Sequence, residues 1–100
     1  MKKSEREELK RLAEEATPGP WTAAIRSNMV NVVCTTFETI CETGKNIDDA
    51  LYIAAANPAA ILELIRQRDE LLAALKRIGE LSYDSQAMRV AWEAIDKAEG

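Results

Sequence analysis

An Asn-Pro pair at residues 57 and 58 separates two stretches of helix-forming residues, and it limits the fold more than any other feature of the chain. Asparagine is a favourable N-cap. Proline is tolerated at the first position of a helix because its missing amide would have no partner there. The pair therefore predicts that a short helix ends near Ala56 and that another begins at Pro58. The three alanines at 54–56 allow these helices, or a sheet behind them, to approach closely.

The helix that begins at Pro58 is predicted to extend to Leu81, and its apolar residues repeat in heptads. Positions a and d of these heptads hold Ile61, Leu64, Arg68, Leu71, Leu75 and Ile78. A helix of about 24 residues spans about 36 Å, which is longer than a small sheet can cover. Two interpretations stay open. Either the helix packs on its own sheet, with Arg68 as a polar exception, or the seam binds a second copy or another protein.

Three further helices are predicted. The first covers residues 1–16, where Ser4 to Glu7 fit a capping box, and the prolines of Thr17-Pro18-Gly19-Pro20 end it because proline lacks an amide donor. A short helix at 48–56 begins with two aspartates, which suit the positive end of the helix dipole. The last covers 85–98 and is expected to fold back on the long helix.

Residues 21–43 are rich in Val, Ile, Thr and Cys and lack a helical period, which predicts two or three short strands. Residues 26–28 are a predicted turn, residues 30–34 a strand, and residues 39–42 the strand that pairs back with it after a tight loop at 37–38. The elements together predict an α+β fold: an N-terminal helix, a small antiparallel sheet, a short helix, a long helix and a C-terminal helix.

One hundred residues suit a single domain, 1–100, with a largely aliphatic core. No apolar run approaches the ~18 residues of a membrane span, and the N-terminus lacks the apolar segment of a secretory signal. These features favour a protein of the cytoplasm that does not enter a membrane. Cys34 and Cys41 would face each other across the predicted hairpin, but they lack the spacing and the further ligands of a redox or metal site. Packing as small buried side chains is favoured, and any pairing would be adventitious.

The residues that carry most enzymatic chemistry are absent or scattered. The sequence contains no histidine, which removes the commonest general base and most zinc sites, and its four glycines form no phosphate-binding motif. Asp48 and Asp49 suit a helix start better than a catalytic pair. Trp21 and Trp92 suit a core better than a ligand platform. We therefore expect no enzymatic activity and no cofactor or metal.

Charge also limits the possible partners. The chain has 13 basic and 17 acidic side chains and a formal net charge of −4. Direct binding to nucleic acid is not expected, because it requires clustered Lys and Arg to displace counterions.

Two segments resemble those of a known family. One is Ala16-Thr17-Pro18-Gly19-Pro20-Trp21, and the other is DALYIAAANP, from Asp49 to Pro58, running into the long helix. In this order and on either side of a β segment, they resemble the Ead-like family of phage and prophage proteins from the accessory early region of temperate bacteriophages. The β segment lacks the Asp-Gly hairpin turn of family members, and the region from Ser82 onward lies outside the resemblance.

The resemblance implies a protein encoded by a phage or prophage, made in the bacterial cytoplasm, with no defined biochemical activity. It also implies structural roles for the matching residues Pro18, Gly19, Pro20, Trp21, Asn57 and Pro58. Trp21 is expected to fill the seam between the first helix and the sheet. The Asn-Pro pair is expected to set the corner between two helices.

The expected function is non-catalytic binding to a host or phage protein. One form of it is inhibition of a host defence system such as a CRISPR effector, in which an acidic surface opposes a basic nucleic-acid channel. The alternatives are a structural or regulatory homo-oligomer, above all a dimer joined through the long helix, and a nucleotide or other small-molecule binder at an oligomer interface. The long helix is the expected place for partners.

Overall fold

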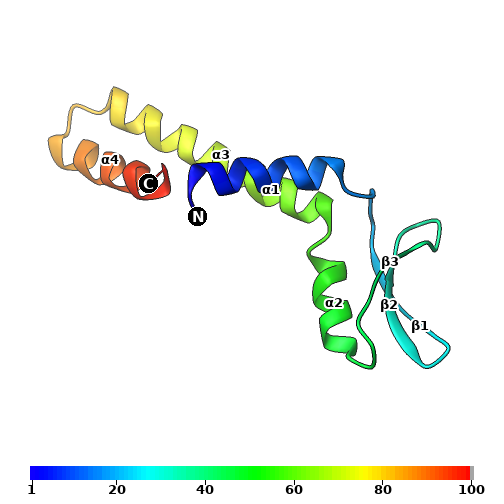
Figure 1. The fold of residues 1–100 in the computed structure, drawn as a ribbon. Helices are drawn as coiled ribbons and strands as arrows, with labels where there is room; N and C mark the ends of the chain where they lie inside the picture. The colour runs from blue at the N-terminus through cyan, green and yellow to red at the C-terminus, as the bar shows by residue number, and fades with distance from the viewer. Residues whose placement is uncertain (100) are drawn as a thin grey trace. The chain divides into compact units, whose positions relative to one another are not determined.

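The computed structural model describes residues 1–99, and over these residues the chain has an α+β fold with four helices and one three-stranded antiparallel sheet (Figure 1). The elements are α1 (Lys3–Glu15), β1 (Thr22–Arg26), β2 (Met29–Val33), β3 (Thr39–Glu42), α2 (Ile47–Ala55), α3 (Pro58–Leu81) and α4 (Ser85–Glu99). The predicted fold class and order of elements are confirmed. No helix in this range is long and apolar enough to cross a membrane.

The chain divides into two compact units. The sheet unit comprises residues 11–63, and the hairpin unit comprises residues 1–10 with 64–99. The single domain expected from the length of the chain therefore stays a prediction.

The core of the sheet unit lies between β2 and α2. The strands are ordered β1-β2-β3, and both neighbouring pairs are antiparallel. Val30 and Val32 of β2 form a buried cluster with Ala50 of α2. The partly buried side chains packed against this cluster are Trp21, Ala23, Ile40, Cys41, Ile53 and Ala54. The sheet and the short helix thus bury each other's apolar faces.

Two left-handed residues close the hairpin between β1 and β2. Ser27 and Asn28 have φ values of 50° and 65°, as a two-residue turn between twisted strands requires. The predicted turn is confirmed. At the end of β1, Arg26 Nη2 donates a hydrogen bond of 2.8 Å to the backbone oxygen of Phe37. This bond ties the loop between β2 and β3 to the first strand.

The prediction that Cys34 and Cys41 face each other across the hairpin is wrong. Cys41 lies opposite Val32, and the register then shifts so that Val33 lies opposite Thr39. Ile40 is the extra residue of this irregularity, and an extra residue in one strand displaces everything beyond it. Cys34 lies just past the end of β2, where its amide donates to the backbone oxygen of Glu38 (3.1 Å), so the residue across the hairpin from Cys34 is Glu38 and not Cys41.

Asn57 joins two helices, as its N-cap role predicts. Its Oδ1 accepts a hydrogen bond from the amide of Ala60 (3.0 Å) in the first turn of α3. Its Nδ2 donates to the backbone oxygen of Ala54 (3.0 Å) near the end of α2. Pro58 is buried as the first residue of α3. One side chain therefore satisfies an acceptor that ends one helix and a donor that begins the next.

The segment that follows α1 is held by Trp21. Its indole Nε1 donates to the backbone oxygen of Thr17 (3.0 Å), and its side chain packs against the core of the sheet unit. Gly19 lies close to this corner, since a Cβ added there would come 3.7 Å from the side chain of Asn57. The residues that carry the family resemblance thus meet in the scaffold of the sheet unit.

The capping box predicted at Ser4 is not formed. The first helix already begins at Lys3, and the amide of Arg6 donates to the backbone oxygen of Lys2 (3.0 Å). Ser4 lies inside the first turn, where its side chain cannot act as the N-cap. Serine at a predicted boundary marks the start of a helix only to within a residue or two.

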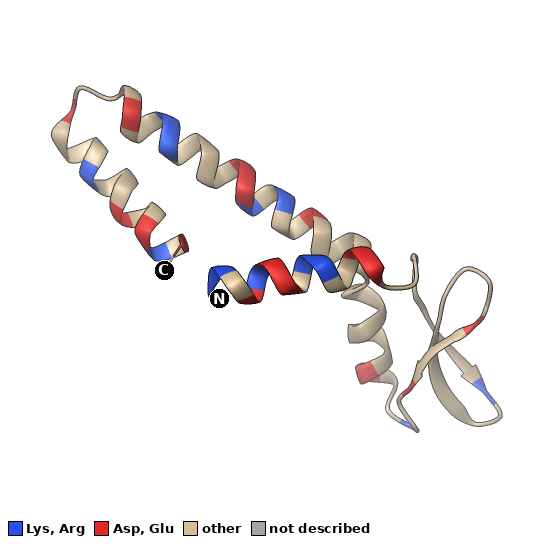
Figure 2. Ribbon diagram, turned by 45° about the horizontal axis from the view of Figure 1, so that its top comes forward, with Lys and Arg blue, Asp and Glu red and all other residues tan. Residues whose placement is uncertain are grey.

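In the hairpin unit, α4 runs back alongside α3 (Figures 1 and 2). Asp84 begins α4, because its Oδ1 accepts from the amides of Gln86 (2.9 Å) and Ala87 (3.2 Å). Gly79 is buried against the indole of Trp92, and a Cβ added there would lie 2.7 Å from Nε1. Only a glycine allows the ring to approach this closely without displacement.

Candidate protein-binding surface

The structure places the six residues of the predicted heptad seam on different parts of α3. Ile61 belongs to the sheet unit, where it is partly buried. Arg68 and Leu75 are partly buried in the hairpin unit. The three residues at position d point to solvent, with exposed fractions of 62% for Leu64, 69% for Leu71 and 51% for Ile78.

Arg68, at position a of the heptads, makes its contacts within the chain. Arg68 Nη2 donates to the backbone oxygen of Ala98 at the end of α4 (2.9 Å), and its Nη1 bonds to Asp69 Oδ1 (2.9 Å). Lys76 Nζ lies 2.7 Å from Glu99 Oε1, and this hydrogen bond lowers the pKa of the Glu99 carboxyl. Arg68, the polar exception in the predicted seam, thus joins α3 to α4.

Position d belongs to an apolar face of the helix, which we call the α3 stripe: Leu64, Leu71, Ala74, Ile78 and Leu81. Steps of three, four and seven residues place these side chains on one side of a helix. Leu81 is 68% exposed and was absent from the predicted seam. It could have been found by continuing the pattern three residues beyond Ile78.

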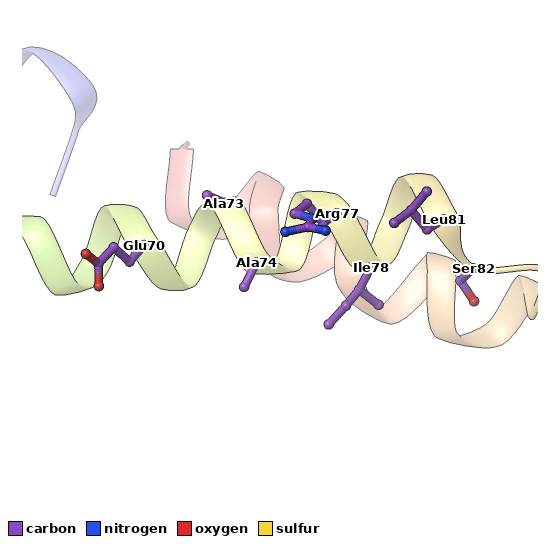
Figure 3. A pocket seen from close by; sticks show the side chains of 7 residues that line it. All are labelled: Glu70, Ala73, Ala74, Arg77, Ile78, Leu81 and Ser82. Carbon is purple, nitrogen blue, oxygen red and sulfur yellow. The ribbon is translucent and has the colours of Figure 1, made fainter.

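Two open grooves meet at Ile78. One, of about 690 Å³, lies along α3 and is lined by Glu70, Ala73, Ala74, Arg77, Ile78, Leu81 and Ser82 (Figure 3). The other, of about 460 Å³, lies between α3 and α4 and is lined by Leu75, Ile78, Asp84, Gln86, Ala87, Val90 and Ala91. The exposed Val90 extends the apolar surface onto α4. Small-molecule sites enclose most of their ligand, whereas these open surfaces suit another protein chain.

Charged residues border the stripe on the side away from α4. Figure 3 shows Glu70 and Arg77 with Ala74 between them along the helix. Arg66 forms an ion pair with Glu70 one turn away. Acidic and basic side chains alternate along α3 (Figure 2), so this helix carries no basic stripe of the kind that follows a nucleic-acid backbone.

The other candidate residues make structural contacts. Asp48 and Asp49 lie exposed in the first turn of α2, where the amide of Asp49 donates to the N-cap Asn46 (3.0 Å). Cys34 Sγ lies 3.1 Å from Thr36 Oγ1, and this hydrogen bond lowers the pKa of the thiol. Both cysteines are unpaired thiols. Within residues 1–99, no three side chains of His, Cys, Asp or Glu lie close enough to hold a metal ion.

The α3 stripe is therefore the surface that stands out for binding in the described part of the chain. Comparisons of the chain with protein-family models, with curated proteins and with solved structures found no match.

Proposed function

We propose that this protein is a non-catalytic phage or prophage accessory protein that acts by binding another protein chain through the α3 stripe. The observation that carries the proposal is the exposure of four large apolar side chains on one face of a helix. Leu64, Leu71, Ile78 and Leu81 are each more than half exposed, at 62%, 69%, 51% and 68%. Exposed apolar side chains that gather on one face mark an interaction site.

The free energy gained on binding grows with the number of stripe side chains that the partner covers. Full burial of a Leu or Ile side chain stabilises a complex by about 1.5–3 kcal/mol. Several such side chains must also offset the loss of translational and rotational freedom on association, about 4–15 kcal/mol. A partner that covers only one of them would bind weakly, whereas one that follows the whole stripe gains from each. The stripe therefore favours an elongated partner, such as a helix.

The phage context rests on the two segments that resemble the Ead-like family. Their residues support the scaffold of the sheet unit, through the Asn57 bonds that join α2 and α3 and the packing of Trp21. In this proposal the protein is made in the cytoplasm of the bacterial host, and its partner is a host or phage protein. Inhibition of a host defence system fits the net charge of −4, because an acidic surface opposes a basic nucleic-acid channel.

A second candidate function is a structural or regulatory oligomer. The specific observation in its favour is the exact seven-residue spacing of Leu64, Leu71 and Ile78, which is the repeat by which helices of separate chains pair. In this reading the partner of the stripe is another α3.

A pull-down of the tagged full-length protein from a bacterial host lysate, read by quantitative mass spectrometry, tests the proposal. Leu71→Arg should abolish recovery of the partner, because a charge then enters the middle of the stripe. The matched control is Leu51→Arg, the same substitution at an exposed leucine of α2 (54%), which should leave recovery unchanged. A partner recovered equally by wild type and Leu71→Arg would refute binding through the stripe.

A further inference from the structure

We propose that the occupant of the α3 stripe is a second copy of this chain, whose α3 lies antiparallel to the first with Leu71 of one copy opposite Ala74 of the other. The inference rests on the second candidate function, the oligomer, and gives the direction and register in which the two copies pair. Three features of the hairpin unit support it: its small core, the repeat along the stripe, and the charges beside it.

The hairpin unit buries little of its apolar surface by itself. Among its described residues, the buried ones are Leu72, Gly79, Ala91 and Ile95. The start of α1 lies near Ile65 and Asp69 of α3, and α4 runs along another side, so within residues 1–99 the α3 stripe has no helical layer against it, which a closed helical core requires. Two hairpins that place their stripes together supply that layer as a four-helix arrangement.

The stripe is self-complementary when it is paired with itself in the opposite direction. In this register Leu71 lies opposite Ala74 of the second copy, and Leu64 lies opposite Leu81. A two-fold axis produces every contact twice. The small side chain of Ala74, at the centre of the stripe, leaves room for the leucine that faces it.

The charges beside the stripe select the antiparallel direction. Glu70 and Arg77 flank the stripe on the side away from α4, one heptad apart. In antiparallel pairing, flanking residues on this side of the two helices face each other, so Glu70 of each copy lies opposite Arg77 of the other. In parallel pairing, Glu70 and Arg77 of one copy would instead face the α4 side of the second copy. The residues there are Leu75 and Ser82, which carry no charge. The antiparallel dimer therefore gains two ion pairs that a parallel dimer lacks.

Sedimentation equilibrium of the full-length protein tests both the dimer and its direction. Wild type should sediment as a dimer, and Leu71→Arg should sediment as a monomer. Glu70→Arg and Arg77→Glu should each raise the dissociation constant about tenfold or more, because each replaces two attractive pairs by two repulsive ones. The control Glu80→Arg makes the same charge change at an exposed position on another side of α3 and should leave the constant unchanged.

Mixing the two charge variants gives the sharpest result. A heterodimer of Glu70→Arg with Arg77→Glu has two attractive pairs again, so the equimolar mixture should recover a dissociation constant close to that of wild type. A change in folding within one chain would not be repaired by mixing. Loss of the dimer in both variants without recovery in the mixture would overturn the antiparallel register.

The inference and the proposed function can fail separately. A wild-type protein that stays monomeric at all concentrations overturns the inference, but a lysate partner that depends on Leu71 would still support the proposed function. A dimer that Leu71→Arg leaves intact places the interface elsewhere and overturns the inference. If the pull-down partner is then also unaffected by Leu71→Arg, the proposed function fails with it.

Discussion

The core between β2 and α2 in the sheet unit and the α3 stripe in the hairpin unit differ in how far their apolar side chains are covered. In the sheet unit, Val30 and Val32 are covered by α2 and leave 6% and 0% of their surface exposed. In the hairpin unit, the leucines at position d of α3 are exposed by more than half. One unit therefore closes its core within the chain, whereas the other presents a face that a partner can close. A substitution should accordingly change stability in the first unit and association in the second.

The largest effect on stability should follow Val32→Asp. Burial of an unpaired carboxyl in the core between β2 and α2 should lower the free energy of unfolding of the sheet unit by at least about 4 kcal/mol. This free energy is measured by urea titration followed by Trp21 fluorescence, in a Trp92→Phe background. Leu71→Arg, in solutions dilute enough to exclude association, should change the same quantity by no more than about 0.5 kcal/mol. Equal losses in the two variants would erase the contrast between the units.

Asn57→Ala should have the next largest effect, about 2 kcal/mol, because it removes an N-cap and leaves the backbone groups of Ala54 and Ala60 without this partner. The loss should appear in the sheet-unit titration. Asn57→Asp retains the acceptor for Ala60 but not the donor to Ala54, so its loss should be intermediate. An Asp variant as unstable as the Ala variant would show that the bond to Ala54 carries the whole effect.

Gly79→Ala should destabilise the hairpin unit by about 1 kcal/mol, the balance between displacement of the Trp92 ring and the better helix propensity of alanine. Thermal unfolding followed by Trp92 fluorescence, in a Trp21→Phe background, measures the change. In a Trp92→Ala background, followed by circular dichroism, the same substitution should instead stabilise by about 1 kcal/mol. Destabilisation in both backgrounds would mean that contact with the ring is not the cause.

The smallest effect should be a pH dependence of the end of α4. Lys76 lowers the pKa of the Glu99 carboxyl, so the contact contributes stability above the ordinary pKa of a glutamate. This contribution is lost as the pH falls through the lowered pKa. Carboxyl chemical shifts should show Glu99 titrating at lower pH in wild type than in Lys76→Met. Identical titrations would show that the two side chains do not pair in solution.

Local signals in the sequence predicted most of the architecture. Asn57-Pro58 marked the corner between α2 and α3 because both residues act through neighbouring backbone groups. The change from helical periodicity to β-branched residues located the sheet. The position of Cys41 opposite Val32 could not be predicted in this way, because the extra residue at Ile40 depends on pairing between strands.

The candidate surface was predicted only in part, for a related reason. A heptad pattern shows that Leu64, Leu71 and Ile78 share a face of α3, but not which side the rest of the chain will cover. The contacts of Arg68 with Ala98 and of Gly79 with Trp92 decide that α4 lies along the neighbouring side. Each contact depends on a polar or small residue of α3, Arg68 or Gly79. A pattern of apolar residues does not take such residues into account.

The hydrogen bond between Arg26 and the loop after β2 affects which substitutions this loop can accept. Arg26 holds a backbone oxygen at residue 37, so the loop keeps its anchor whatever side chain residue 37 carries. Phe37 is 70% exposed, and its φ of 64° is one that glycine or asparagine adopts more readily. The anchor of this loop is therefore independent of the side chain at residue 37, whereas the left-handed backbone there limits which side chains fit without strain.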